Sequence, residues 1–455
     1  MPYPALAPVR ECTPQLLRRE LQDRLDTLAR HHRVPGAQLV LDTGAEVVAL
    51  HTGVADAATG DPFTGDTAVP VGSLTKPYTA ALVLLLADDG DLDLDDRAAA
   101  HLPEFRHLPE VTVRHLLSHT GGLPTGPDSD AAARTTAVHY LASVCTPGDA
   151  LFPPGTGFSY SNAGYVAAGR LVEAVTGMTW QEAVATLLLE PLDTVPAFLA
   201  TAEGTAADPA ARPLAAGHAL NAATGRARPV RQNLAPLEAP AGALSLSATD
   251  LAALGAAAIG RSKVLPPEVA EELRRPQPGA RPGTLADGWG PGLALYRQDD
   301  RLWCGHDGNA MGTSCHLRAE PDSGTVVAFT GNAGAATALW RDLAAELGGL
   351  TGLTVPAAIG PVAAGEPVVL PECAGSYANG GIRYRVEPAR DGGLTLSVDG
   401  DLPLPLRCYA DLSYDLVDPE TGRPEPGGRF HRDPETGVVD LVQVSGRTAR
   451  RVGPA

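Results

Sequence analysis

The chain has 455 residues, of which 44% are hydrophobic, and it contains 50 glycines and 41 prolines. This size and composition exclude a disordered chain and indicate a loop-rich globular protein with more than one domain. The formal net charge of -18, without a cluster of Lys and Arg, argues against nucleic acid and against an anionic membrane as partners.

The amino-terminal residues 1–10 lack the basic region and the apolar stretch of a secretory signal. No apolar run approaches the roughly 18 residues that a membrane span needs, so we expect a cytoplasmic protein. The six cysteines have no zinc-site spacing and are expected to be buried free thiols. Cys304 and Cys315 would be able to face each other across a hairpin, but a reducing compartment disfavours a disulfide there.

Leucines at helical spacing predict an amphipathic helix over residues 13–32, and strands are expected at 38–41 and 46–50. The apolar run that follows Lys76 and Pro77 predicts a buried helix that ends at Gly90, with Ser73 in its first turn.

Ser73 and Lys76 are the first candidate catalytic residues. Lysine occurs only at positions 76 and 263, while arginine supplies the other cations. A desolvated lysine can lose its proton and act as a base, which arginine cannot do. Residues three apart share a helix face, so Ser73 and Lys76 would form an activated nucleophile beside the free N–H groups of a helix N-terminus. The Ser-x-x-Lys pattern is short, and chance alone is able to supply it.

The middle of the chain predicts mainly helices and loops. His115 and His119 are interpreted as packing residues, because no nearby carboxylate completes a metal-ligand set. Tyr160 and Asn162 are placed on a loop before a helix over 163–175. Tyr-x-Asn carries no weight alone, since it recurs at Tyr377–Asn379.

Beyond Gly288 strands are expected at 292–296, 301–305, 313–318 and 325–330, followed by a helix over 335–347. Strands from both ends of this region imply one mixed antiparallel sheet flanked by helices, an α/β (α+β) class. Residues 356–370 are expected to be a linker between a catalytic domain (1–355) and a small β domain (371–455), because the stretch is rich in Pro, Gly and Ala.

At this point the chain resembles the penicillin-recognising serine enzymes, which include class C β-lactamases, D-peptidases, esterases and some peptide cyclases. The likeness rests on motifs in the family's order, namely Ser73-x-x-Lys76, Leu117-Ser118-His119-Thr120-Gly121-Gly122-Leu123-Pro124, Pro153-Pro154-Gly155, Tyr160-x-Asn162 and His306-x-Gly308. It spans roughly residues 13–350 and implies a β-lactamase/transpeptidase-like domain, here followed by a lipocalin-like β-barrel.

The resemblance also implies roles for individual residues. Ser73 would be the nucleophile, Lys76 and Tyr160 would relay its proton, and the backbone N–H groups of Ser73 and Asn309 would form the oxyanion hole. Asn162 would hold a substrate amide. Arg447, in the last predicted strand region, is interpreted either as a cation delivered to the substrate or as a solvated surface residue.

His306 and Gly308 depart from the Lys-Thr-Gly motif that is common in the family. A permanent cation for a substrate carboxylate is replaced by a titratable ring, which disfavours a lactamase and favours an ester, amide or thioester substrate. The alternative is that His306 merely fills a strand position.

The closest subgroup by resemblance is the penicillin-binding-protein-type thioesterases. It implies transfer of a nonribosomal peptidyl thioester, held on a carrier protein and ending in a D-residue, to Ser73, followed by head-to-tail macrolactamisation. A serine hydrolase, either an esterase or a D-aminopeptidase, is the first alternative, and a non-catalytic peptide-binding protein is the second. P-loop, dinucleotide, nucleophile-elbow and zinc-peptidase motifs are missing, and we expect no cofactor and no metal.

Overall fold

Seven strands from two distant parts of the sequence form one sheet in this computed structural model, which describes residues 14–199, 212–221, 224–357, 365–389, 392–419 and 422–454. The strand order is β2-β1-β11-β10-β9-β8-β7, and all neighbouring pairs are antiparallel. Their bounds are β1 Gly36–Asp42, β2 Val47–Gly53, β7 Gly288–Trp289, β8 Ala294–Gln298, β9 Arg301–Gly308, β10 Ser314–Glu320 and β11 Thr325–Gly331.

The pairing of β1 with β11 joins the early strands to the late ones, with Ala37 opposite Gly331 and Asp42 opposite Val326. Strands β1, β10 and β11 are buried along their whole length, so the centre of the sheet is covered on both faces. The predicted sheet of early and late strands is therefore confirmed.

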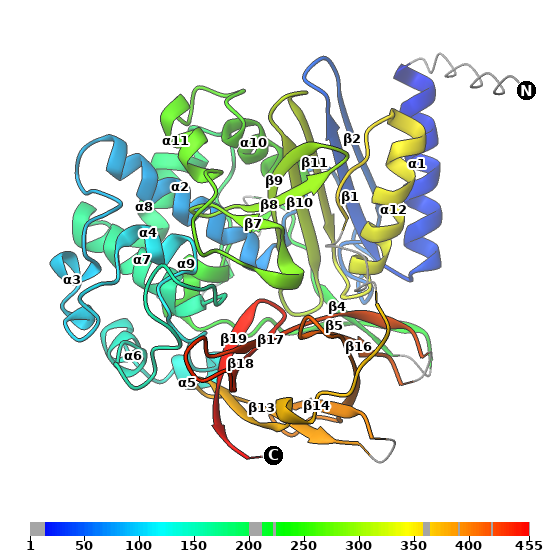
Figure 1. Cartoon of the computed structure of the whole chain (residues 1–455). Helices are drawn as coiled ribbons and strands as arrows, with labels where there is room; N and C mark the ends of the chain where they lie inside the picture. Colours follow the sequence, from blue (N-terminus) through cyan, green and yellow to red (C-terminus); the bar gives the residue numbers. More distant parts are fainter. Residues whose placement is uncertain are drawn as a thin grey trace, which may run out of the picture.

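Helices cover the two faces unequally (Figure 1). One face carries α1 (Pro14–His31) and α12 (Ala336–Thr351), which pack on each other and on β2 and β10. The other face carries α10 (Ala248–Ala258) and a helical region made of α2 Thr75–Asp88, α3 Ala98–His101, α4 Val113–Leu117, α5 Ser129–Ala132, α6 Ala137–Val144, α7 Asn162–Thr176, α8 Trp180–Val184, α9 Ala239–Gly242 and α11 Pro267–Leu273.

The central helix α2 follows a 3-10 turn, η1 (Gly72–Leu74), and ends two residues before Gly90. It is buried nearly all round, as expected of a helix inside a helical cluster. Helix α7 begins where the Ser161 hydroxyl accepts a hydrogen bond from the Gly164 N–H at 3.1 Å, and it ends at Gly177, whose φ is 71°. The helix was expected to begin at residue 163, with Asn162 on the preceding loop. In the structure Asn162 is the first residue of the helix.

Smaller elements complete the first region and lie around its rim. They are β3 Val69–Pro70 paired with β6 Ser245–Leu246, the hairpin of β4 Gly217–Asn221 and β5 Arg226–Val230, the 3-10 turns η2 Pro103–Phe105, η4 Pro236–Glu238 and η5 Gly283–Leu285, and the π-helical turn η3 Ala185–Leu189.

The C-terminal strands form a closed eight-stranded barrel, each strand paired with its neighbours in sequence and the last paired with the first. Its bounds, after the turn η6 Pro371–Cys373, are β12 Gly375–Asn379, β13 Ile382–Pro388, β14 Leu394–Val398, β15 Leu404–Cys408, β16 Ser413–Val417, β17 Pro424–Arg432, β18 Val439–Val444 and β19 Arg447–Gly453. Tyr377, Tyr414 and Phe430 are among the side chains that fill its interior, so the small β domain is a packed barrel. The barrel lies beneath the helical region and the sheet (Figure 1).

The cysteines of the described residues are buried free thiols at positions 145, 304, 315, 373 and 408, while Cys12 lies outside them. Cys304 is paired with Ala319 and Cys315 with Gly308, so the two cysteines do not face each other across the β9–β10 hairpin. Of the linker expected at 356–370, residues 358–364 also lie outside the described ranges. No helix in the described ranges combines the length and the apolar character that a membrane crossing requires.

Candidate active site

Ser73 and Lys76 meet at the turn that leads into α2. The Lys76 Nζ atom lies 3.2 Å from the Ser73 Oγ atom and donates to the Ala241 carbonyl at 2.8 Å. The lysine is fully buried, while the serine is half-buried at the end of a cavity. The expected helical spacing therefore brings hydroxyl and amine together, with the serine in the 3-10 turn.

Burial, and after it the positive charge of Arg447, lower the pKa of Lys76 to about 7. The carboxylate of Glu238 acts in the opposite direction. A lysine with this pKa is partly neutral near neutral pH, so its amine is able to accept the Ser73 proton.

Tyr160 lies on the loop before α7, on the other side of Ser73. Its hydroxyl is 3.4 Å from His306 Nε2, and its ring lies 5.0 Å from Lys76 Nζ. Burial raises the pKa of Tyr160, although a hydrogen bond with Ser73 and the charge of Arg447 oppose this. Tyr160 thus holds its proton in the free protein.

His306 lies near the end of β9 and is buried. Burial and the charge of Lys76 lower the pKa of His306 to about 4, so the ring is neutral at neutral pH. Its Nδ1 lies 2.6 Å from the Asp307 carbonyl oxygen, which only accepts, so the proton resides on Nδ1 and Nε2 faces the Tyr160 hydroxyl as an acceptor.

Asp307 anchors this end of β9 from behind. Its carboxylate accepts hydrogen bonds from Arg318 at 2.6 Å and from His316 at 2.8 Å. Burial alone would raise the pKa of Asp307, but Arg318 and His316 outweigh it and hold that pKa below its usual range. The fully buried Arg318 guanidinium also lies 4.0 Å above the Tyr296 ring.

Gly308 and Asn309 bring β9 against the turn that carries Ser73. A Cβ atom on Gly308 would lie 2.0 Å from the Val71 carbonyl oxygen, and one on Gly72 would lie 2.1 Å from the Asn309 carbonyl oxygen. The backbones of Ser73 and Asn309 therefore lie in neighbouring segments in close contact, which is the placement that two oxyanion-hole donors need.

Ser73 opens into a cavity of about 250 Å³ whose lining includes Tyr160, His306 and Asn309. Aromatic side chains that the sequence did not single out complete it, namely Trp289 from β7 and Tyr296 from β8. The Trp289 ring lies 5.3 Å from that of His306 and 5.9 Å from that of Tyr160. No short motif surrounds Trp289 or Tyr296, so in the sequence only their positions on strands would suggest that they line the site.

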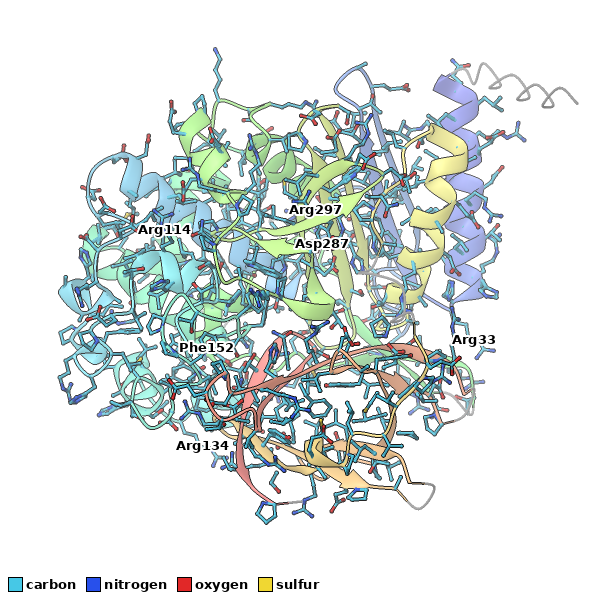
Figure 2. All side chains as sticks on the ribbon, viewed as in Figure 1. Arg33, Arg114, Arg134, Phe152, Asp287 and Arg297 are labelled. Carbon is cyan, nitrogen blue, oxygen red and sulfur yellow. The ribbon has the colours of Figure 1, made fainter. Side chains whose placement is uncertain are left out.

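The hairpin that carries these two aromatics is fixed at its edge. The Asp287 carboxylate accepts a hydrogen bond from the Arg297 backbone N–H at 2.7 Å, and both residues lie at this edge of the sheet (Figure 2). Trp289 and Tyr296 are buried, so this side of the cavity is largely apolar.

Asn162 and Arg447 line a second cavity of about 510 Å³, between the helical region and the barrel. Arg447 lines both cavities, its guanidinium lies 5.5 Å from the Tyr160 ring, and its Nε donates to Thr125 Oγ1 at 3.3 Å. Of the two interpretations of Arg447, the structure favours a cation at the site. Asn162 lies beside the Ser73 cavity, in the second one.

Barrel residues also hold the Tyr160 loop. The Tyr160 N–H donates to the Gly446 carbonyl at 2.9 Å, and the Thr448 hydroxyl donates to the Phe158 carbonyl at 2.8 Å. Asn379 is fully buried and donates to Ser159 Oγ at 3.2 Å. Asn379 belongs to the second Tyr-x-Asn, at Tyr377–Asn379, to which the sequence analysis assigned no role.

The two histidines interpreted as packing residues each accept a hydrogen bond from a backbone N–H group. His115 Nδ1 accepts from the Thr112 N–H at 3.2 Å, and His119 Nδ1 accepts from the Ser161 N–H at 3.1 Å. The His119 ring also lies 4.4 Å from that of Tyr160. Across the described residues, no group of three or more His, Cys, Asp and Glu side chains is arranged to hold a metal.

Comparisons with known proteins agree with this geometry. The β-lactamase family profile matches residues 18–348. Penicillin-binding protein 4 of Amycolatopsis lactamdurans is 34% identical over 79% of this chain and 97% of its own length, and esterase EstB of Burkholderia gladioli is 30% identical over 60% and 78%. The crystal structure of SurE is 38% identical, with a TM-score of 0.84 over 96% of this chain and 99% of SurE, and SurE has also been solved with D-Leu.

Proposed function

Because the chain belongs to the β-lactamase family, we propose that it is a serine acyltransferase that takes a peptidyl thioester onto Ser73 and releases it as a macrolactam. The observation that carries the acylation step is the Ser73–Lys76 contact, in which a fully buried amine with a pKa of about 7 lies 3.2 Å from the hydroxyl.

In the acylation step Lys76 accepts the Ser73 proton while Oγ attacks the thioester carbon. The backbone N–H groups of Ser73 and Asn309 stabilise the oxyanion, and Tyr160 supplies the proton that the departing thiolate takes up. Lys76 then returns a proton to Tyr160. The neutral His306 accepts from the Tyr160 hydroxyl in the free protein and so holds the phenol oxygen in place until the proton is transferred, while Gly308 allows the close backbone approach.

The acyl chain would extend from Ser73 along the boundary with the barrel. Asn162 holds a substrate amide there, and Arg447 offers its guanidinium to a substrate carbonyl. A D-residue at the activated end is supported by the SurE structure with D-Leu, which is 36% identical over 96% of this chain. We further propose that a phosphopantetheine thioester on a carrier protein delivers the peptide.

Release by an amine requires that water lose the competition for the acyl-enzyme. The buried aromatic side chains on one side of the Ser73 cavity and the barrel residues on another favour a folded-back peptide by proximity and by limiting water. These features support cyclisation over the hydrolase alternative, in which water takes the acyl group.

The test uses a linear peptidyl N-acetylcysteamine thioester with a D-residue at the thioester end and a free amino terminus. Cyclic product should appear with the wild-type protein and disappear in Ser73→Ala, as measured by mass spectrometry. Linear acid alone from a range of such peptides would assign the hydrolase function instead. Absence of any covalent adduct on Ser73 would leave only a non-catalytic binding role.

A further inference from the structure

The cavity beside Asn162 has walls of two kinds, and the mechanism above uses only two of its residues. The barrel wall is largely apolar and includes Ile382 and Val398. The opposite wall is acidic and includes Asp128 and Glu238, and Asp399 lies at the barrel rim. Among the described lining residues, Arg447 is the cation, and it stands at the side shared with the Ser73 cavity.

Glu238 is a buried carboxylate that faces this cavity without a counter-ion. It is 3% exposed, and none of the ion pairs within 4.0 Å among the described residues includes it. The Ser129 hydroxyl donates to it, yet burial raises its pKa despite that hydrogen bond and the charge of Lys76. A buried carboxylate in this state is stabilised by a cation that enters the cavity.

A second buried polar group lies in the same wall. The Tyr140 hydroxyl has no hydrogen-bond partner in the described part of the chain and is packed against Gly126, where a Cβ atom would lie 2.0 Å from it. Gly126 lines the cavity, and the charge of Glu238 contributes to the raised pKa of Tyr140. This wall therefore holds a buried carboxylate without an ion pair and, behind Gly126, a buried hydroxyl without a hydrogen-bond partner among the described residues.

The position of Glu238 ties the cavity to the acyl centre. Glu238 ends η4 and comes immediately before α9, whose Ala241 carbonyl accepts from Lys76 at 2.8 Å. Lys76 in turn contacts Ser73. A cation held at Glu238 would therefore lie on the Lys76 side of an ester formed on Ser73. Arg447, on the other side, carries a like charge and would repel this cation.

We propose that this cavity is the nucleophile subsite, in which Glu238 binds the cationic amino end of a peptide and the barrel wall accepts its apolar side chain. The inference rests on the proposed acyl-enzyme at Ser73. The bound ammonium gives one proton to neutral Lys76, and the amine attacks the ester carbon. The C–N bond forms, the C–Oγ bond breaks, and the second proton leaves nitrogen for Ser73 Oγ through Tyr160, which leaves a neutral amide and protonated Lys76.

The test measures how an acyl-enzyme partitions between an added amine and water. Ser73 is acylated from an N-acetyl-D-leucyl N-acetylcysteamine thioester in the presence of L-leucinamide, and the ratio of amide to acid is determined. Glu238→Gln keeps an acceptor for Ser129 but removes the charge, and we expect the ratio to fall at least about tenfold. Glu190→Gln is the matched control, because Glu190 is exposed and lines neither cavity. This variant should keep the wild-type ratio.

The ratio does not depend on how fast Ser73 is acylated, so it separates this inference from the proposed function. An unchanged ratio in Glu238→Gln, or no amide from the wild-type protein, would overturn the subsite. No thiol release at all would overturn the acyl-enzyme and the subsite together. If Glu238→Gln does not fold, Glu238→Asp and Glu238→Ala are compared instead. Glu238→Asp keeps the negative charge and should therefore give a higher ratio of amide to acid than Glu238→Ala.

Discussion

In the proposed acylation, Lys76 is the residue whose charge state would set the rate, and two neighbours of opposite charge act on it. Burial and Arg447 lower its pKa to about 7, while Glu238 raises it. Only the neutral amine accepts a proton from Ser73, so the fraction of neutral Lys76 limits the reaction. His306, with a pKa of about 4, keeps one charge state throughout the range in which Lys76 titrates.

We therefore expect the rate of covalent labelling of Ser73 by a fluorophosphonate to fall about tenfold per pH unit below a break near pH 7. Arg447→Leu removes a positive charge that favours the neutral amine, so the break should move to higher pH. Glu238→Gln removes a negative charge that favours the ammonium, so it should move to lower pH. If the break in the pH profile lies at the same pH in the wild-type protein and in both variants, a group other than Lys76 controls acylation.

Gly308 offers a second test at the same scale, because a Cβ there would meet the Val71 carbonyl at 2.0 Å. Gly308→Ala should push β9 away from the Ser73 turn and slow labelling by about 10²–10³, the usual loss when an oxyanion donor is misplaced. Gly334→Ala is the control, since nothing lies within 4 Å of the new Cβ. Equal labelling rates for the two variants would contradict the proposed placement of the Asn309 donor.

At the scale of elements, strands β12, β18 and β19 of the barrel hold the loop that carries Tyr160. Asn379 on β12 accepts from the Thr125 N–H at 2.7 Å and donates to the Thr448 carbonyl at 2.8 Å, besides its contact with Ser159. These bonds link three segments that are distant in sequence. The barrel is thus part of the wall of the active site.

Asn379→Ala should leave buried backbone groups of Thr125 and Thr448 without partners, at a cost of about 1–3 kcal/mol for each group. We expect a lower unfolding midpoint together with slower labelling of Ser73, because the Tyr160 loop loses its support. Ser376→Ala, on the same strand but bonded near the chain end, is the control. Slower labelling should persist at temperatures well below the midpoint of the variant; full activity there would limit Asn379 to a stabilising role.

At the scale of the whole molecule, the sequence predicted the elements of the first region and of the barrel better than the junction, the contact between these two parts. Helix and strand periodicity located the sheet strands and the buried helix, and Ser73-x-x-Lys76 is a local pattern that one turn brings together. Trp289 and Glu238 carry no local pattern, and the Tyr-x-Asn pattern of Asn379 is too short to single it out. They reach the site only because the sheet hairpin, the turn before α9 and the barrel meet around Tyr160. Such tertiary proximity has no signature in a single sequence, and for that reason Arg447 had two open interpretations.

The junction also predicts how the molecule unfolds. Gln443 and Thr448 of the barrel are buried and bond backbone groups of the first region, Arg281 at 3.0 Å and Phe158 at 2.8 Å. Polar contacts that are this well buried couple the two parts, so calorimetry of the wild-type protein should give one transition.

The variant Gln443→Leu/Thr448→Val keeps side-chain volume but removes both donors, leaving the two carbonyls unsatisfied at the interface. We expect the barrel and the first region to unfold separately in this variant, with two resolved transitions. Arg385→Gln on the exposed barrel surface removes only an ion pair of 3.8 Å and should retain the single transition. Two transitions already present in the wild-type protein would mean that the barrel folds independently, and the hold on Tyr160 would then be a docking equilibrium, open to regulation by whatever separates the two parts.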